Sequence, residues 1–429
     1  MRRLSRPFAA SAPTPPAADT SALPVSVTKS RRLGAASRPA LRTHRATAWR
    51  RGFVLLLILP VLAAGGAASA YYYRLHRWAT FLKLSDLPDT APLTRARRIL
   101  VLSPHCDDET LGVGALISDS RRAGIPVTVA FLTNGDGFPV AAGRALREVN
   151  ISPADYVRFA EIRQRESLSA GKELGVAGKD VVFLGYPDRG LKSLWETNWS
   201  PRSLFRSPYT QHKHSPYART YSPQTSYCGE SLLKDLVRLM EQVRPTDIYV
   251  THPADDHPDH YAAAAFAQAA LRECRNGGGS DSWATRSRLR FYLVHRGDWP
   301  LPQGLHPDQP LLPPVGLAGL DTHWSVFRAS SGAIRSKQRA LERYVSQTEI
   351  SGRFLRSFVR INEIFGEMPD CAACPEPALP ALVARQSRGA DTGTPGVSAR
   401  DATGDDLMRY AAPAADLTGL AVRSVSPGV

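Results

Sequence analysis

The stretch 98-RILVLSPHCDDETLGVG-114 places an apolar, strand-like run directly before a cluster of polar side chains and the start of a helical pattern. Four further apolar runs follow along the chain: 126-PVTVAFLTN-134, 180-DVVFLGY-186, 247-DIYVTHP-253 and 289-LRFYLVH-295. Each run is short, nearly continuous and rich in Val, Ile, Phe and Tyr. This pattern is typical of a strand covered on both faces of a sheet.

Helical patterns separate these runs. They lie at residues 110–123, 152–174, 229–243 and 258–273, with two more expected at 331–347 and 352–365. Strands that alternate with helices form right-handed βαβ units. We therefore predict an α/β fold: a Rossmann-like, doubly wound, mainly parallel sheet with helices on both faces. It would form a single catalytic domain over residues 97–368, with an aromatic-rich insertion at 190–228.

The flanking segments differ in composition from this domain. Residues 1–51 hold eleven Lys or Arg against one acid, so ten of the fifteen net positive charges lie in this segment. The folded part is thus only mildly basic, which argues against nucleic-acid binding. We expect residues 1–51 and the Pro- and Ala-rich residues 369–429 to be disordered, and residues 74–96 to be a linker.

The run 52-GFVLLLILPVLAAGGAASAYYY-73 has 22 residues without a charge and follows the basic segment. It predicts a transmembrane signal anchor with its N-terminus in the cytoplasm. The alternative is a twin-arginine signal, 49-WRRGFVLLL-57, with cleavage after 68-ASA-70. The first hypothesis places the domain at the cytoplasmic membrane, facing the periplasm or exterior. The second exports it after cleavage.

Polar clusters follow four of the predicted strands: 104-PHCDDE-109, 133-TNGDG-137, 186-YPDRG-190 and 252-HPADDHPDH-260. Because ligands of open α/β sheets bind beyond the carboxyl ends of the strands, these clusters are expected to meet at one rim. A hydrolytic zinc site needs three protein ligands and an open position. His105 and Asp108 can supply two of them from one turn, and His260 the third. Another divalent transition metal would fit the same donors.

The neighbouring residues suit the rest of a hydrolytic reaction. Asp107 points differently from Asp108 in such a turn, so its carboxylate can accept the proton of a water molecule activated by the ion. His257 precedes a helix N-terminus, where an oxyanion would be stabilised, and we assign it to the substrate oxygen. Asp259 can orient one of the imidazoles.

These motifs resemble those of the PIG-L/LmbE-like family of N-acetylglucosaminyl-phosphatidylinositol de-N-acetylases and mycothiol-pathway deacetylases. The family's boxes appear here in order as 104-PHCDDE-109, 133-TNG-135, 163-RQRE-166, 186-YPD-188 and 257-HPDH-260. The resemblance implies a zinc-dependent enzyme that removes the acetyl group from an N-acetylglucosamine-type sugar or glycoconjugate. The substrate could be a free sugar, a lipid-linked sugar or a polysaccharide, and no oligomeric state follows from the sequence.

The resemblance also assigns roles to residues. Zinc would be held by His105, Asp108 and His260, with Asp107 as general base, His257 as acid or electrostatic partner, and Arg163 and Asp188 on the sugar side of the substrate. Arg163 could equally be a solvated charge on a helix. The chain departs from the family at Cys106, which replaces a proline and is expected to be a bystander, and at Asp255, where some members have a tyrosine.

Three further hypotheses concern the whole chain or its insertion. A dinucleotide-binding module is suggested by 112-GVG-114, but the acids before these glycines would repel a pyrophosphate. A membrane-anchored binding or scaffold protein of the same fold, without activity, is the main alternative to an enzyme. The aromatic side chains of residues 190–228 could stack on sugar rings or could simply pack on the surface.

Overall fold

The computed structural model describes residues 56–71, 73, 83–277, 279, 282–314, 317, 322–368, 397–399 and 420–422. The chain divides into two units, Met1–Ser69 and Ala70–Val429. A helix is described at residues 56–71. Within the part of the chain that the structure describes, no helix is both long enough and apolar enough to cross a membrane. Residues 1–55 and 72, and the pair in 371-CAAC-374, lie outside the described residues.

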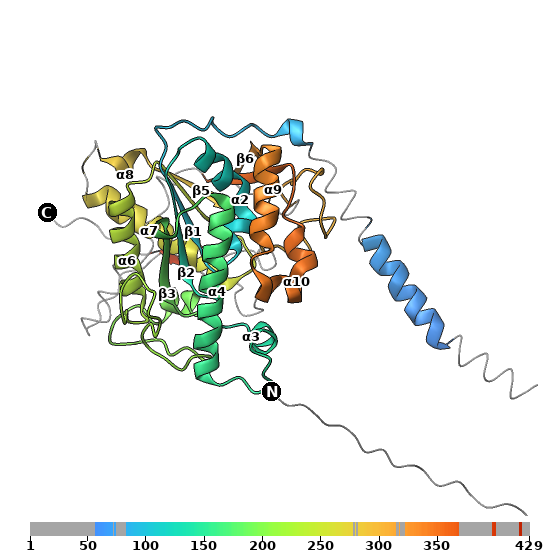
Figure 1. Cartoon of the computed structure of the whole chain (residues 1–429), viewed down its shortest axis with the longest axis horizontal. Helices are drawn as coiled ribbons and strands as arrows, with labels where there is room; N and C mark the ends of the chain where they lie inside the picture. The colour runs from blue at the N-terminus through green and yellow to red at the C-terminus, as the bar shows by residue number, and fades with distance from the viewer. Residues whose placement is uncertain are drawn as a thin grey trace, which may run out of the picture. The chain divides into compact units, whose positions relative to one another are not determined.

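A seven-stranded sheet forms the centre of the second unit, in the order β3-β2-β1-β4-β5-β7-β6 (Figure 1). The strands are β1 (Ile99–Ser103), β2 (Val127–Thr133), β3 (Val181–Tyr186), β4 (Asp247–Thr251), β5 (Arg288–Tyr292), β6 (His323–Arg328) and β7 (Asn362–Glu367). The pairs among β1 to β5 are parallel, whereas β7 runs antiparallel to both β5 and β6. The predicted α/β class is confirmed, with an antiparallel edge added to the parallel sheet.

Helices cover both faces of this sheet (Figure 1). They are α2 (Asp108–Arg122), α3 (Pro139–Leu146), α4 (Pro153–Leu174), α5 (Leu191–Glu196), α6 (Gly229–Val243), α7 (Pro258–Gly277), α8 (Trp283–Arg286), α9 (Ser331–Leu341) and α10 (Val345–Arg356). Two 3-10 turns are also present, η1 (Leu84–Asp86) and η2 (Gly178–Asp180). Short strands β8 (Val397–Ala399) and β9 (Leu420–Val422) form a separate antiparallel pair.

The core has two layers, one on each face of the sheet, because successive side chains of a strand point to opposite faces. Along β1, Ile99 and Val101 pack on one face with α2, α4, α9 and α10, while Leu100 and Leu102 pack on the other with α5, α6, α7 and α8. All four of these side chains are fully buried. Because both faces of β1 are covered, its sequence is apolar throughout and does not alternate with polar residues.

The helix start predicted at residue 152 is also explained locally. The Ser152 side chain accepts the backbone N–H of Asp155, whose carboxylate in turn accepts the Ser152 N–H. Pro153 fits the first helical position, where no N–H partner is needed. Gly175 ends the helix with a φ of 83°.

The helix expected at 352–365 is wrong in its second half. α10 ends at Arg356, and Asn362–Glu367 is instead strand β7, which pairs with β6 over its whole length. Neither of these strands was predicted. Both are short, and the burial of β7 depends on its place between β5 and β6, which the local pattern does not contain.

The sheet order reverses at β1. β2 lies on one side of β1 and β4 on the other. The chain therefore leaves the carboxyl ends of β1 and β4 in different directions. This is the position where ligands bind in open α/β sheets. The loop after β1 begins with 104-PHCD-107, and the loop after β4 contains 252-HPADDH-257.

Candidate active site

Three atoms from the loop after β1 and from the first turns of α2 and α7 converge to form a compact triangle. His105 Nδ1 lies 3.2 Å from Asp108 Oδ2 and 3.1 Å from His260 Nε2, and these last two atoms are 3.1 Å apart. Three ligands of a tetrahedral zinc at about 2.0–2.1 Å would be separated by roughly 3.3 Å. The donor set and its spacing therefore fit a metal ion.

The charges around the triangle also favour a cation. Burial alone would lower the pKa of His260, but the carboxylates of Asp108 and Asp255 raise it to about 9. Burial likewise acts to lower the pKa of His105, yet Asp188 and Asp108 hold it well above its usual value. Asp108 has a pKa well below its ordinary range, because its two histidine neighbours outweigh the effect of burial. A divalent cation would satisfy the same carboxylates.

Two carboxylates contact the other side of the His105 ring. His105 Nε2 lies 3.2 Å from Asp188 Oδ1 and 3.4 Å from Asp259 Oδ2. Asp188 also accepts the backbone N–H of Gly137, and Asp259 accepts those of Arg189 and Leu191. Carboxylates held in this way fix the orientation and tautomer of a ligating imidazole. The structure thus brings Asp188 and Asp259 against His105.

Asp255 has the corresponding place beside His260. Its Oδ2 lies 3.2 Å from His260 Nδ1 and accepts the backbone N–H groups of Val294 and His295, both at 2.9 Å. Its Oδ1 accepts the N–H of His257 at 3.0 Å. Although burial raises the pKa of this carboxyl, His260 brings it down to about 2. The residue that departs from the family pattern is therefore a buried anchor for His260 and for the loops after β4 and β5.

Asp107 adopts a backbone conformation that L-residues rarely adopt, with a φ of 130°. Its N–H donates to Glu109 Oε2 at 3.2 Å, and its Oδ1 lies 3.3 Å from Arg163. Burial raises the pKa of Asp107 to about 8, with Arg163 opposing and Asp108 adding to the rise. Strain of this kind costs about 1–3 kcal/mol and persists where the surrounding contacts enforce it.

Arg163 is one of those contacts, and it is not a solvated charge. Its side chain is buried, and its guanidinium donates to the carbonyl oxygens of Gly135 and Cys106 as well as approaching Asp107. A Cβ on Gly135 would overlap the guanidinium, and Gly135 has a φ of 64°. The glycine of 133-TNG-135 thus makes room for Arg163, which joins the loops after β1 and β2.

His257 lies immediately before α7, with its ring centroid 4.6 Å from that of His105. Its Nδ1 accepts the backbone N–H of Asp259 at 3.2 Å. Burial and the neighbouring His105 keep its pKa well below the usual value. In the neutral ring the proton is therefore on Nε2, which makes this atom a hydrogen-bond donor.

A fourth histidine, His295, belongs to the cluster and was missed at the sequence level. Its ring centroid lies 4.9 Å from that of His260 and 5.6 Å from that of His257. It can form a group of potential metal-binding atoms with Asp108 and His260, all within 4.8 Å of one another. The available signal was its position at the end of 289-LRFYLVH-295, which is the same rim of the sheet.

Cys106 points into the core. Its side chain is fully buried among apolar residues that pack on the α2 face of the sheet, and its Sγ lies 4.0 Å from the Thr133 carbonyl oxygen. Burial raises the pKa of its thiol to about 12, so a thiolate is disfavoured at neutral pH.

The aromatic side chains of the insertion divide into two groups. Trp195 and Trp199 pack on Phe266 of α7, with ring centroids 4.9 and 6.0 Å away, and are half-buried against the core. Tyr209 instead lies beside Asp188. A Cβ on Gly137 would be 2.8 Å from Tyr209 Cε2 and 3.0 Å from Asp188 Oδ2.

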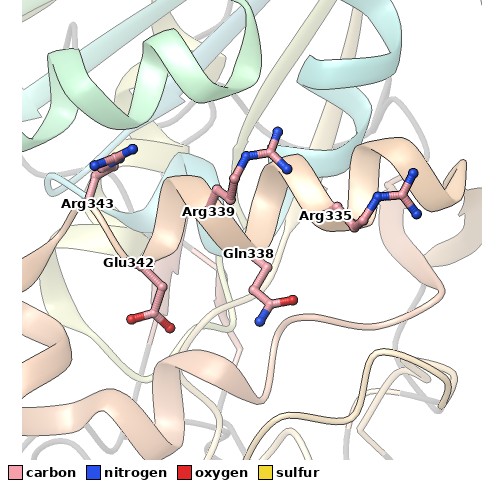
Figure 2. Close-up of a pocket in the computed structure, with 5 residues that line it drawn as sticks. All are labelled: Arg335, Gln338, Arg339, Glu342 and Arg343. Atoms are coloured by element: carbon pink, nitrogen blue, oxygen red, sulfur yellow. The ribbon is translucent and has the colours of Figure 1, made fainter.

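A separate groove of about 480 Å³ lies on α9 (Figure 2). Its lining comprises Arg335, Gln338, Arg339, Glu342 and Arg343. It contains none of the predicted site residues, and Glu173 pairs with Arg339 at 2.9 Å and with Arg343 at 2.6 Å. We therefore place the chemistry at the rim of the sheet and not in this groove.

Comparison with known proteins agrees with the geometry of the rim. Residues 100–271 match the family model described as PIG-L, GlcNAc-PI de-N-acetylase. The 1D-myo-inositol 2-acetamido-2-deoxy-alpha-D-glucopyranoside deacetylase of Kribbella flavida is 28% identical over 308 residues, covering 66% of this chain and 92% of that protein. The probable N-acetyl-alpha-D-glucosaminyl L-malate deacetylase 2 of Bacillus subtilis is 28% identical over 155 residues, covering 35% of this chain and 65% of that protein.

Among solved structures, the N,N'-diacetylchitobiose deacetylase from Pyrococcus horikoshii aligns over 70% of this chain and 92% of its own. The sequence identity is 18% and the TM-score 0.40. Likeness at this level carries no inference about activity.

Proposed function

We propose that this chain is a member of the PIG-L family, whose model matches residues 100–271, and that it is a zinc-dependent N-deacetylase acting on an N-acetylglucosamine-type sugar or glycoconjugate. The observation that carries the proposal is the triangle of His105 Nδ1, Asp108 Oδ2 and His260 Nε2, whose edges are 3.1–3.2 Å. His105, Asp108 and His260 would hold the ion, and three protein ligands with a fourth position open to water and substrate are typical of hydrolytic zinc sites.

A zinc ion bound there would polarise the acetamide carbonyl and lower the pKa of a nearby water molecule. Asp107 is the group placed to take the proton of the attacking water, because Arg163 and Glu109 hold it in a single backbone conformation. Burial raises the pKa of Asp107 above the usual carboxyl range, which makes its carboxylate a stronger proton acceptor.

The remaining groups orient the reactants. His257 has its Nε2 proton available for the substrate, because Nδ1 is occupied by the Asp259 N–H. Asp188 and Asp259 hold the His105 ring, and Asp255 holds His260. Asp188 can also contact a sugar hydroxyl, with Tyr209 beside it as a face for the pyranose ring. Water adds to the acetyl carbon, the C–N bond breaks, and the products are acetate and a protonated amine.

We further propose that residues 52–73 anchor the enzyme at the cytoplasmic membrane with the domain outside. The uncharged sequence of this segment and the basic residues before it support this placement. Lipid-linked sugars or envelope polysaccharides would then be accessible substrates. Fractionation of cells expressing the full chain tests the placement, and recovery of the intact protein in the soluble fraction would refute the anchor.

The activity is tested by acetate release from a panel of N-acetylhexosamine glycans, with wild type compared to Asp107→Asn and Asp108→Ala. We expect one zinc per wild-type chain, zinc retained in Asp107→Asn with turnover reduced at least 100-fold, and zinc lost in Asp108→Ala. Bound zinc without acetate release from any glycan would show that the substrate class is wrong. Absence of metal from the wild type would favour an inactive protein of the same fold.

A further inference from the structure

We propose that His295 is a second catalytic imidazole, which donates a hydrogen bond to the acetyl carbonyl oxygen as that oxygen gains negative charge. The inference rests on the proposed deacetylase function. In this proposal His295 stabilises the oxyanion, and His257 protonates the departing amine.

The position of His295 relative to the triangle supports this role. One of its ring nitrogens lies within 4.8 Å of one carboxylate oxygen of Asp108 and of one ring nitrogen of His260. His260 is completely buried, whereas His295 is partly exposed. His295 is therefore accessible to a molecule that approaches the triangle from solvent, as a substrate carbonyl would have to do.

Contacts of both its backbone and its ring hold His295 in position. His295 follows β5, and its backbone N–H donates to Asp255 Oδ2 at 2.9 Å. The same Asp255 atom lies 3.2 Å from His260 Nδ1, so one carboxylate sets the relative position of a ligand and of His295. The His295 ring stacks on Phe354 of α10, with centroids 5.7 Å apart and planes 11° apart. Such preorganisation is what electrostatic stabilisation of a transition state requires.

His295 fits the role of donor better than that of a fourth ligand. The three triangle atoms are within 3.2 Å of one another, whereas no hydrogen bond among the described residues joins the His295 ring to them. A fourth protein ligand would also close the open position that hydrolysis needs. His257 has a different constraint, because its Nδ1 is held by the backbone of α7. The two imidazoles can therefore act on different substrate atoms, the oxygen and the nitrogen.

The test compares the full chain with His295→Ala and His295→Gln, and uses His323→Ala on β6, an exposed histidine, as the control. Three quantities are measured: zinc per chain, kcat and KM for acetate release, and the Kd for acetate of the zinc-loaded protein. Acetate serves as a stable probe for negative oxygen at the site.

We expect His295→Ala to keep its zinc, to lose about 100- to 1,000-fold in kcat with a small change in KM, and to bind acetate at least about tenfold more weakly. His295→Gln should recover part of both losses, because its amide is also a donor. His323→Ala should match wild type.

Two results would overturn the assignment. Loss of zinc in His295→Ala would make the residue a ligand, and unchanged kcat and acetate affinity would leave it without a role in the reaction. An active wild type with an unaffected His295→Ala refutes this inference alone. A wild type that releases no acetate from any glycan refutes the proposed function as well.

Discussion

Glu109 Oε2 accepts the backbone N–H of Asp107 at 3.2 Å and thereby helps to hold that residue at a φ of 130°. The other Glu109 oxygen accepts the hydroxyls of Thr110 at 2.5 Å and Tyr344 at 2.6 Å. A buried carboxylate thus connects the strained turn after β1 to the segment between α9 and α10. The turn directs Asp107 and Asp108 to different partners.

The strain at Asp107 predicts a difference between two substitutions. Asp107→Gly and Asp107→Ala both remove the carboxylate, but only glycine adopts a φ of 130° without steric cost. We expect the glycine variant to have the higher free energy of unfolding, by about 1 kcal/mol. Urea denaturation of both variants measures this difference. If the alanine variant were as stable as the glycine variant, the backbone at residue 107 would not be strained. Both should be inactive.

Cys106 is predicted to be dispensable for chemistry. Cys106→Ala removes a fully buried sulfur and should lower the free energy of unfolding by about 1–2 kcal/mol. Zinc content and kcat should stay within about twofold of wild type, because the thiol faces the core. The proline variant, Cys106→Pro, should likewise keep its zinc. Metal analysis and acetate release check both variants, and zinc loss in either would assign the thiol a role at the metal.

Tyr209 is predicted to contribute to sugar binding. Its ring is half-buried beside Asp188 and forms an edge-on pair with Tyr156, at a centroid distance of 5.3 Å. Tyr209→Ala should raise KM for a sugar amide by about fivefold with little change in kcat, as expected for a lost ring contact of about 1 kcal/mol. Tyr209→Phe keeps the ring and is the matched control. Equal KM values for all three proteins would exclude stacking by this residue.

His252 predicts a pH dependence of stability. Burial lowers its pKa to about 4, and its Nδ1 accepts the Ala254 N–H, which requires an unprotonated nitrogen. In the unfolded chain its pKa is about 6.5, so the unfolded state binds more protons between these values. The contribution of neutral His252 to the free energy of unfolding is therefore fully present above pH 6.5. It is lost as the pH falls toward 4, and the loss is about 3 kcal/mol at most.

This dependence is measured by urea unfolding of the metal-free full chain between pH 7.5 and 5. His252→Asn keeps an acceptor for the Ala254 N–H but has no titrating group, so its stability should fall less steeply with acid than that of wild type. His323→Asn, at an exposed position, should follow wild type. Parallel curves for wild type and His252→Asn would refute the prediction.

Much of the fold could be predicted from local pattern. The five parallel strands and the helices between them follow from runs such as 98-RILVLSP-104, because burial on both faces requires apolar residues at every position. Their carboxyl ends carry the polar boxes, so the rim and the residues His105, Asp108 and His260 were predictable. Their close approach joins positions 155 residues apart, and it was inferred from parallel topology alone.

Other features depended on tertiary contacts that no local pattern contains. β7 became a strand because it lies between β5 and β6, not because of a clear alternation in its sequence. Arg163 could have been a surface charge, and only the packing of α4 against two loops buried its guanidinium.

The sequence by itself determined which side chains could bind a metal and which strands would carry them, since both depend on residue type and short-range spacing. The tertiary structure decided which neighbours those side chains have. It placed Asp255 between His260 and His295, and it separated Tyr209 near Asp188 from the tryptophans packed against the core. These relations arise where loops from different strands meet at one rim, so they depend on distances in space and not along the chain.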